Sequence, residues 1–220
     1  MIPKQYYISL DTETANGLDC PLVYDVGFAV TDNKGHIYET YSYVVYDIFF
    51  ERKDLMETAY YKEKIPKYLD DIKNGTRKVV RFLTVYSKIR ELVKKYNITA
   101  IMAHNARFDV NALNTTLRYL TKSKMRYFFP YGMPIWDTLT MARCTIGKSP
   151  TYKVWCKMNN YLTKNGRPKL TAEILYRFIS FNENFVESHT GLEDVLIEIV
   201  IFVKCVKQHK KMQRTYYKVA

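Results

Sequence analysis

The segment Tyr6-Tyr7-Ile8-Ser9-Leu10-Asp11-Thr12-Glu13 decides the fold of this 220-residue chain. Its aromatic and β-branched start is typical of a β-strand, and its end carries two acidic residues two positions apart. Side chains two apart in a strand point to the same face of a sheet. The segment therefore predicts a buried strand whose end presents the carboxylates of Asp11 and Glu13 on one side.

The chain around this strand predicts an α/β fold. Apolar runs at 23–31 and 37–46, joined by the turn residues Asp32-Asn33-Lys34-Gly35, complete an antiparallel β-meander. Apolar residues then recur every three or four positions from Val79 to Val93, which predicts a long helix, and Asn74-Gly75 ends the helix before it.

The second half of the chain alternates strands with helices, which implies parallel strands in part of the sheet. Strands are expected at 98–103 and 135–137, and helices at 105–120, 139–143, 170–178 and 191–209. Residues 144–170 are basic and rich in Gly, Pro and Asn, so they are predicted to form a loop-rich insertion. The length favours one domain, residues 1–220, with this insertion.

The composition indicates a globular protein that binds a polyanion. Hydrophobic residues make up 47% and charged residues 25%, which excludes disordered, collagenous and coiled-coil chains. The formal net charge is +12, and the sequence pI is about 9.4. Such an excess of positive charge concerns partners rather than fold, and nucleic acid is the first candidate.

The cysteines and the apolar stretches indicate a cytoplasmic protein without a membrane segment. Cys20, Cys144, Cys156 and Cys205 form no CxxC pair, so we expect buried thiols in a reducing compartment and no zinc site. Residues 1–10 lack the features of a signal peptide, and the longest apolar stretch, 195–203, is shorter than the roughly 20 residues that a spanning helix needs.

Two further acidic motifs accompany Asp11 and Glu13. His104-Asn105-Ala106-Arg107-Phe108-Asp109 follows the strand 98–103, and His189-Thr190-Gly191-Leu192-Glu193-Asp194 opens the last helix. Taken singly, the three motifs have structural explanations: a solvated strand end, a carboxylate that complements a helix dipole, and a helix-start acid beside a surface histidine. Their order along the chain is what indicates a common site.

The ordered set resembles the DEDDh class of the DnaQ-like 3′-to-5′ exonuclease superfamily over residues 6 to about 203, at Asp11, Glu13, Asp109, His189 and Asp194. The resemblance implies an RNase H-like fold, a mixed β-sheet flanked by α-helices, and release of nucleoside 5′-monophosphates from a 3′ end. The opening Asp-Thr-Glu-Thr-Ala-Asn is also similar to small exonucleases of bacteriophage replication regions.

Three positions refine this resemblance. The sister DEDDy class has a tyrosine four residues before its last aspartate, where this chain has Thr190, so the histidine class fits better. Family members often continue Asp-x-Glu with Thr-Thr-Gly, whereas here Ala15 and Asn16 precede Gly17, so the backbone near the terminal nucleotide is expected to differ. Asp137, at a strand-to-helix junction, is interpreted as a helix N-cap.

The four carboxylates suit phosphodiester hydrolysis. Two divalent ions about 3.5–4 Å apart neutralise charge on the attacking and departing oxygens, and Mg²⁺ or Mn²⁺ prefers oxygen ligands. Asp11, Glu13, Asp109 and Asp194 are therefore the predicted ligands of two Mg²⁺ or Mn²⁺ ions. His189, with an ordinary pKa near 6.5, suits removal of a proton from the attacking water.

The resemblance also implies substrate contacts. His104 and Asn105 are expected near the phosphate or sugar, and the backbones of Thr12 and Thr14 near the 3′-hydroxyl. Phe108 is expected against the terminal base, with core packing as an equal alternative.

A second candidate contact is the cluster of Lys122, Lys124 and Arg126 with Tyr127, Phe128 and Phe129. It predicts either a single-strand track or a basic helix end followed by a buried aromatic strand.

The expected substrate is a single-stranded or frayed 3′ end, of DNA in the first place and of RNA as an alternative. A catalytically silent 3′-end binding module is a competing hypothesis, although such a module has no need for four converging acids. Another is a proofreading subunit that works with a polymerase. The sequence leaves open whether the chain forms a homodimer.

Overall fold

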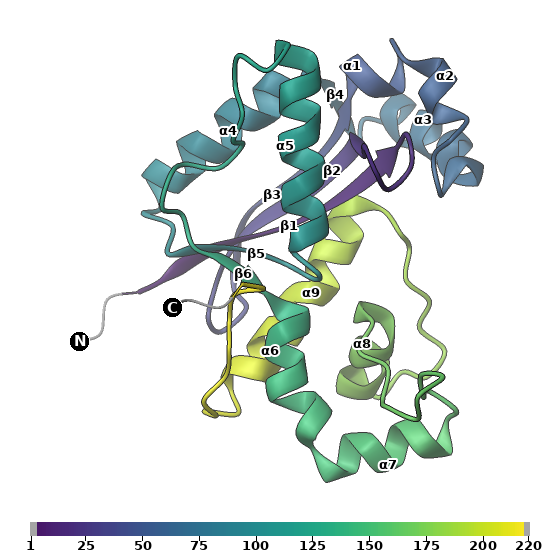
Figure 1. The fold of residues 1–220 in the computed structure, drawn as a ribbon, viewed down its shortest axis with the longest axis vertical. Helices are drawn as coiled ribbons and strands as arrows, with labels where there is room; N and C mark the ends of the chain where they lie inside the picture. The colour runs from purple at the N-terminus through teal and green to yellow at the C-terminus, as the bar shows by residue number, and fades with distance from the viewer. Residues whose placement is uncertain (1–3, 218–220) are drawn as a thin grey trace.

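The computed structural model describes residues 4–217 and centres on a mixed six-stranded sheet of order β4-β3-β2-β1-β5-β6 (Figure 1). The antiparallel meander consists of β1 (Tyr6–Ala15), β2 (Leu22–Asp32) and β3 (Ile37–Val45). Parallel pairings add β4 (Lys78–Val80) beside β3, β5 (Ala100–Ala103) beside β1, and β6 (Ile135–Asp137) beside β5. The predicted α/β fold with antiparallel and parallel strands is confirmed.

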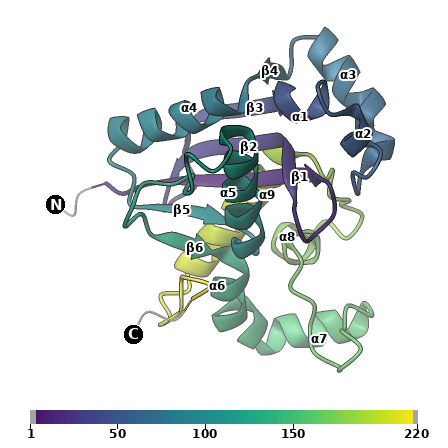
Figure 2. The same ribbon diagram turned by 45° about the horizontal axis from the view of Figure 1, so that its top comes forward.

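Helices cover both faces of this sheet (Figure 2). On one face, α4 (Phe82–Lys95) and α5 (Arg107–Thr121) share an apolar core with Ile8 and Leu10 of β1. On the other face, α6 (Thr138–Cys144), α8 (Ala172–Ser180) and α9 (Gly191–Val206) share a core with Tyr7. Alternate side chains of β1 thus enter opposite cores, and every residue of β2 is buried, as expected for a central strand covered on both sides.

Shorter helices connect these elements. They are α1 (Tyr46–Phe49), α2 (Lys53–Met56), the 3₁₀ turn η1 (Lys62–Lys64), α3 (Ile65–Lys73), the 3₁₀ turn η2 (Ile146–Lys148) and α7 (Pro150–Met158). Within residues 4–217, no helix combines the length and the apolar character needed to cross a membrane.

The helix predicted from Val79 begins later than its apolar pattern suggests. Val79 and Val80 belong to β4, which pairs with β3, and α4 begins at Phe82. The Phe82 N–H donates to Asp47 Oδ2 at 2.7 Å, so a carboxylate from α1 satisfies a free donor at the start of α4. Two β-branched residues before a helix fit either period, and only the partner strand decides between them.

The segment predicted as loop-rich, 144–170, is partly helical. It contains η2 and α7, because Pro150 suits a first helical turn and Tyr152 and Cys156, four residues apart, are both buried on one side of α7. Residues 159–171 form no further helix and carry an isolated bridge between Leu162 and Pro168.

The prediction of buried thiols holds for only two of the four cysteines. Cys156 and Cys205 are buried, Cys20 is exposed and Cys144 is partly exposed, and all four are free thiols.

Candidate active site

Two elements bring three of the predicted carboxylates together. Asp11 and Glu13 lie on one face of β1, and Asp194 lies in the first turn of α9, which packs on that strand. One carboxylate oxygen from each residue lies within 4.8 Å of the other two. Residues about 180 positions apart in the sequence therefore meet at one point, as the motif order predicts.

The fourth carboxylate, Asp109, is held beside this group from the opposite side of β1. Asp109 lies in the first turn of α5, and its Oδ1 accepts hydrogen bonds from the Thr12 backbone N–H at 3.1 Å and the Thr12 hydroxyl at 2.8 Å. Thr12 sits between Asp11 and Glu13 and is itself buried. Asp109 is outside the three-oxygen group, but its charge strongly affects Asp11.

The surroundings of the four carboxylates favour their protonated, uncharged form and so raise their pKa values. Burial raises the pKa of Glu13 to about 9, with Asp25 and Asp194 adding repulsion. Burial also raises the pKa of Asp194 to about 8 and that of Asp109 to about 7. Burial also raises the pKa of Asp11 well above its ordinary value, and the charges of Asp109 and other nearby carboxylates add to this rise.

This donor set fits divalent cations. Converging carboxylate oxygens are the ligands of hard ions such as Mg²⁺ and Mn²⁺, and a bound cation would offset the repulsion that raises these pKa values. Asp11, Glu13 and Asp194 can hold a metal ion together, with Asp109 adjacent.

His189 lies in the connection that precedes α9, in a left-handed backbone conformation with φ of 49°. Its ring stacks on Tyr61, with centroids 4.4 Å apart and planes 10° from parallel. Nδ1 lies 3.9 Å from Glu187 Oε2, and no side chain or backbone group of the described chain hydrogen-bonds Nε2. Burial and the charge of Lys64 lower the pKa of His189, so the ring is neutral near pH 7.

A buried ion pair fixes the start of α9 against β2. Asp25 Oδ2 accepts a hydrogen bond from the Gly191 N–H at 2.9 Å and pairs with Arg77 Nη1 at 3.1 Å. Arg77 Nη2 also pairs with Glu193 Oε2 at 2.9 Å. Gly27 and Gly191 bring the two backbones together so closely that a Cβ on Gly27 would lie 2.1 Å from Gly191 C. The position of Asp194 thus depends on three residues outside the motifs, Asp25, Gly27 and Arg77, and on Gly191 and Glu193 within the last motif.

A fifth acid of the site was not predicted from the sequence. Glu198 is buried, Oε1 accepts a hydrogen bond from the His104 N–H at 3.0 Å, and burial with the charge of Asp109 raises its pKa. It lies four residues after Asp194, hence on the same face of α9, which is the signal that identifies it in retrospect. Glu187, two residues before His189, was also missed, and burial with the charge of Glu173 raises its pKa to about 7.

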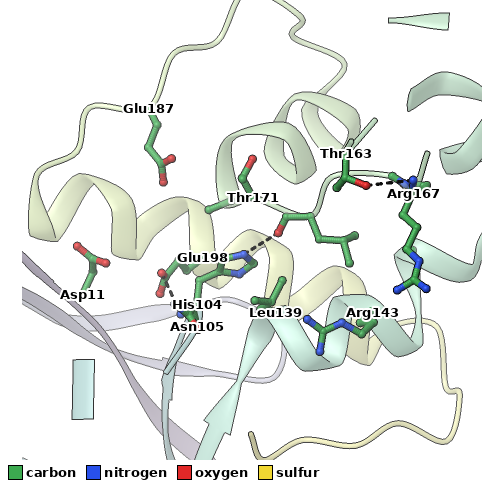
Figure 3. A pocket seen from close by; sticks show the side chains of 14 residues that line it. Asp11, His104, Asn105, Leu139, Arg143, Thr163, Arg167, Thr171, Glu187 and Glu198 are labelled. Atoms are coloured by element: carbon green, nitrogen blue, oxygen red, sulfur yellow. Dashed lines mark hydrogen bonds between the residues drawn. The ribbon is translucent and has the colours of Figure 1, made fainter. Parts of the chain in front are cut away.

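Of the four predicted carboxylates, Asp11 lines a pocket of about 830 Å³ (Figure 3). Asp11, Glu187 and Glu198 lie toward one end of it, and Arg143 and Arg167 toward the other. Both arginines are exposed, and neither forms an ion pair with any part of the chain that the structure describes. The pocket is acidic where cations fit and basic where phosphates fit.

The predicted substrate residues are divided between this pocket and the protein interior. His104 lines the pocket, but its Nε2 donates to the Leu170 carbonyl at 2.8 Å and its Nδ1 lies 2.9 Å from Thr138 Oγ1. The ring therefore ties residue 170 to the start of α5, and burial lowers its pKa. The backbone N–H and the hydroxyl of Thr12 likewise both donate hydrogen bonds to Asp109 and are not free for substrate.

Three other predicted contacts remain accessible. Asn105 is exposed in the same pocket, with φ of 68°, and Thr14 is half-buried beside an irregularity of the β1–β2 pairing. Phe108 is half-buried and lines a neighbouring hollow with Asn105, outside the buried core. Asp137 acts as the predicted N-cap: its side chain accepts from the Leu139 N–H at the start of α6.

The cluster after α5 is divided between core and surface, and its aromatic residues form no strand. Phe128 and Phe129 are buried, as in the structural alternative, whereas Tyr127 is 73% exposed.

No protein-family model and no curated protein matches this sequence. The structure, in contrast, resembles solved exonucleases. Exonuclease I of E. coli in complex with a 5cy-dT13 oligonucleotide aligns with 94% of this chain at a TM-score of 0.60 and 16% identity. Exonuclease I of Methylocaldum szegediense aligns with 94% at a TM-score of 0.54 and 13% identity.

These similarities concern the fold, a mixed sheet flanked by helices, and this chain adds to it three acidic residues of β1 and α9 that lie together. The chain shares its fold with these exonuclease I structures, which agrees with the fold that the motif resemblance implied. It spans 41% of the length of either exonuclease I chain.

Proposed function

We propose that this chain is a single-domain, metal-dependent 3′-to-5′ exonuclease that releases nucleoside 5′-monophosphates from single-stranded or frayed 3′ ends. The observation that carries the proposal is the convergence of Asp11, Glu13 and Asp194, with Asp109 adjacent, in an exonuclease fold. Four acids in a chain of net charge +12 repel the polyanion that the rest of the surface attracts, which is reasonable only where cations intervene. This argues against a silent 3′-end binding module.

Asp11, Glu13, Asp109 and Asp194 would hold two Mg²⁺ or Mn²⁺ ions. Such ions neutralise charge on the attacking and departing oxygens and lower the pKa of water. A zinc-ion-bound form is known for an E. coli exonuclease I complex with single-stranded DNA, which supports divalent metal dependence.

His189 is the proposed general base. Its ring is neutral near pH 7, Nδ1 faces Glu187, and Nε2 is available to accept a proton from water. Stacking on Tyr61 restricts the ring to one plane. Arg143 and Arg167 are proposed to bind phosphates of the strand that enters the pocket, because they are unpaired cations at the end opposite the acids.

The test uses DNA and RNA oligonucleotides labelled at the 5′ or the 3′ end and incubated with Mg²⁺, Mn²⁺ or EDTA. We expect stepwise shortening of 5′-labelled strands, a labelled mononucleotide from 3′-labelled strands, and no reaction in EDTA. Shortening from the 5′ end, or full activity in EDTA, contradicts the proposal. Tight capture of 3′ ends without degradation would favour the silent module.

Replacing His189 by glutamine is expected to lower kcat by about 10²- to 10⁴-fold, the range for a lost acid-base group. In the wild type at saturating Mg²⁺, the rate should rise with pH and reach its plateau at a lower pH than a free imidazole with a pKa near 6.5 would give. The reason is that the lowered pKa of His189 makes the ring neutral at a lower pH. The variant should lose this acidic limb. His209→Gln, at an exposed position beyond the other end of α9, is the control. An unchanged acidic limb in H189Q would assign the base to another group.

The double variant Arg143→Glu/Arg167→Glu is expected to raise KM for oligonucleotides at least about tenfold at low salt, with a smaller change in kcat. The salt dependence of KM should also flatten, since two phosphate contacts are lost. Lys78→Glu, an exposed charge reversal on the edge strand β4, should leave KM near the wild-type value. Equal effects of the two charge reversals would mean that net charge alone is responsible.

A further inference from the structure

A second hollow, of about 690 Å³, lies away from the carboxylates between α4, α5 and the segment 122–134 that follows α5. Two tyrosines of this segment stand out at its rim: Tyr127 is 73% exposed, and Tyr131 is fully exposed. The neighbouring Phe128 is buried and its N–H donates to Asn114 Oδ1 at 2.7 Å, which anchors the segment to α5. The two exposed rings therefore stand on an anchored base.

The charge of this hollow is entirely positive. Arg90 and Arg126 line it, and its lining contains no acidic residue. Arg90 lies on the Tyr86 ring, 4.4 Å from the centroid, and its Nε is the one buried side-chain polar atom in residues 4–217 without a hydrogen-bond partner. Lys122 and Lys124 are exposed at the start of the same segment. Neither arginine forms an ion pair within the described part of the chain, and cations of this kind beside exposed aromatic rings match a polyanion with flat bases.

One smaller hollow, on α5, lies between this surface and the carboxylate pocket and shares lining residues with both. Asn105 lines both the carboxylate pocket and the hollow that contains Phe108. Val110 and Asn114 line that hollow and the tyrosine hollow as well. Arg107 adds a further cation between them. A strand that leaves the carboxylates past Asn105 therefore meets a continuous series of depressions.

We propose that the tyrosine hollow binds unpaired nucleotides of the substrate strand, several positions to the 5′ side of the bond that is cut. Tyr127 and Tyr131 stack on bases, and Arg90 and Arg126 bind the intervening phosphates. Stacking of this kind tolerates any sequence, because every base has a flat face. The inference rests on the proposed function for the placement of the 3′ end, although binding at the hollow itself requires no cleavage.

The test compares Tyr127→Ala/Tyr131→Ala with the wild type on fluorescent dT4 and dT20. Binding is measured by anisotropy on phosphorothioate strands, which resist hydrolysis, in Ca²⁺, so that cations occupy the acidic site. For dT20 we expect at least about tenfold weaker binding, from the loss of two stacking platforms. For dT4, which is too short to span both sites, affinity should be unchanged. In Mg²⁺, degradation of dT20 should become more distributive while the rate on dT4 is kept. Phe181→Ala, at a 90% exposed aromatic outside the hollow, is the matched control.

Several outcomes separate this inference from its rivals. Equal losses for dT4 and dT20, or no loss for either, would overturn it. Unchanged oligonucleotide binding with a dimer lost in the double variant would assign the hollow to a second copy of the chain. Length-dependent binding in a protein without nuclease activity would refute the proposed function and leave the tyrosine site standing.

Discussion

Replacing Asp11 by asparagine is expected to reduce mononucleotide release by at least about 10³-fold while making the metal-free protein more stable. The loss of rate follows because Asp11 is central to the proposed ion site, and stabilisation by bound ions amounts to several kcal/mol of the barrier. The gain in stability follows because Asp11 is surrounded by carboxylates that raise its pKa. Asparagine keeps the shape of the side chain and removes its charge.

The same repulsion sets a pH dependence for the metal-free protein. Asp109, Asp194 and Glu13 have pKa values raised to about 7, 8 and 9, whereas unfolded carboxyls titrate near 4. Between these values the native state binds more protons than the unfolded state, so the free energy of unfolding falls as pH rises from about 5 to 9. Each of these groups contributes up to about 1.4 kcal/mol per pH unit to this slope as long as it is protonated only in the native state.

Urea unfolding in EDTA at pH 6 and pH 8.5, repeated in excess Mg²⁺, measures both effects. The wild type should lose stability at the higher pH in EDTA and regain it in Mg²⁺, and Asp11→Asn should show a smaller change on both counts. Asp70→Asn, at an exposed carboxylate without an ion pair in the described chain, should behave like the wild type. A metal-free Asp11→Asn protein that is less stable than the wild type would show that the acids do not repel one another.

The sequence predicts the parts of this molecule that depend on local periodicity and spacing. The meander, the parallel strands and the common face of Asp11 and Glu13 follow from alternation, from strand–helix order and from two-residue spacing. Asp194 was placed with these two acids only through the order of the motifs and the resemblance that it carries. Val79 and Val80 were assigned to the wrong element because their membership in β4 is decided by pairing with β3. No local pattern contains that information.

The supports of the site were missed for a related reason. Asp25 and Arg77 are 52 residues apart in the sequence. Each residue alone suggests only an acid in a strand or a cation at the surface, yet in the structure both are buried and form an ion pair. Glu198 stands in an apolar helical stretch, where one acid suggests a solvated helix face. Only the packing of α9 on β1 and β2 brings these residues together as the framework of the candidate site.

Gly27 provides the most direct test of that framework, because it has no side chain and no proposed role in metal binding, proton transfer or substrate binding. A Cβ at this position would lie 2.1 Å from the backbone atoms Gly191 C and Leu192 N and 2.4 Å from Leu192 Cα. Backbone atoms at a helix start cannot rotate away as a side chain does, so α9 must move off β2. Gly27→Ala is therefore expected to lower the free energy of unfolding by about 3 kcal/mol or more.

The displacement should also disable the site in protein that remains folded. Asp194 lies three residues after Gly191 and His189 lies two residues before Gly191, so both residues move with the start of α9. At temperatures below its melting transition, the specific activity of Gly27→Ala should therefore fall well below that of the wild type. Gly75→Ala is the matched control: a Cβ there meets no atom within 4 Å, and only its φ of +75° is unfavourable, at about 1–2 kcal/mol. Thermal unfolding and oligonucleotide turnover of the two variants provide the comparison. If Gly27→Ala loses no more stability than Gly75→Ala and keeps full turnover, the close approach of β2 and α9 does not position Asp194.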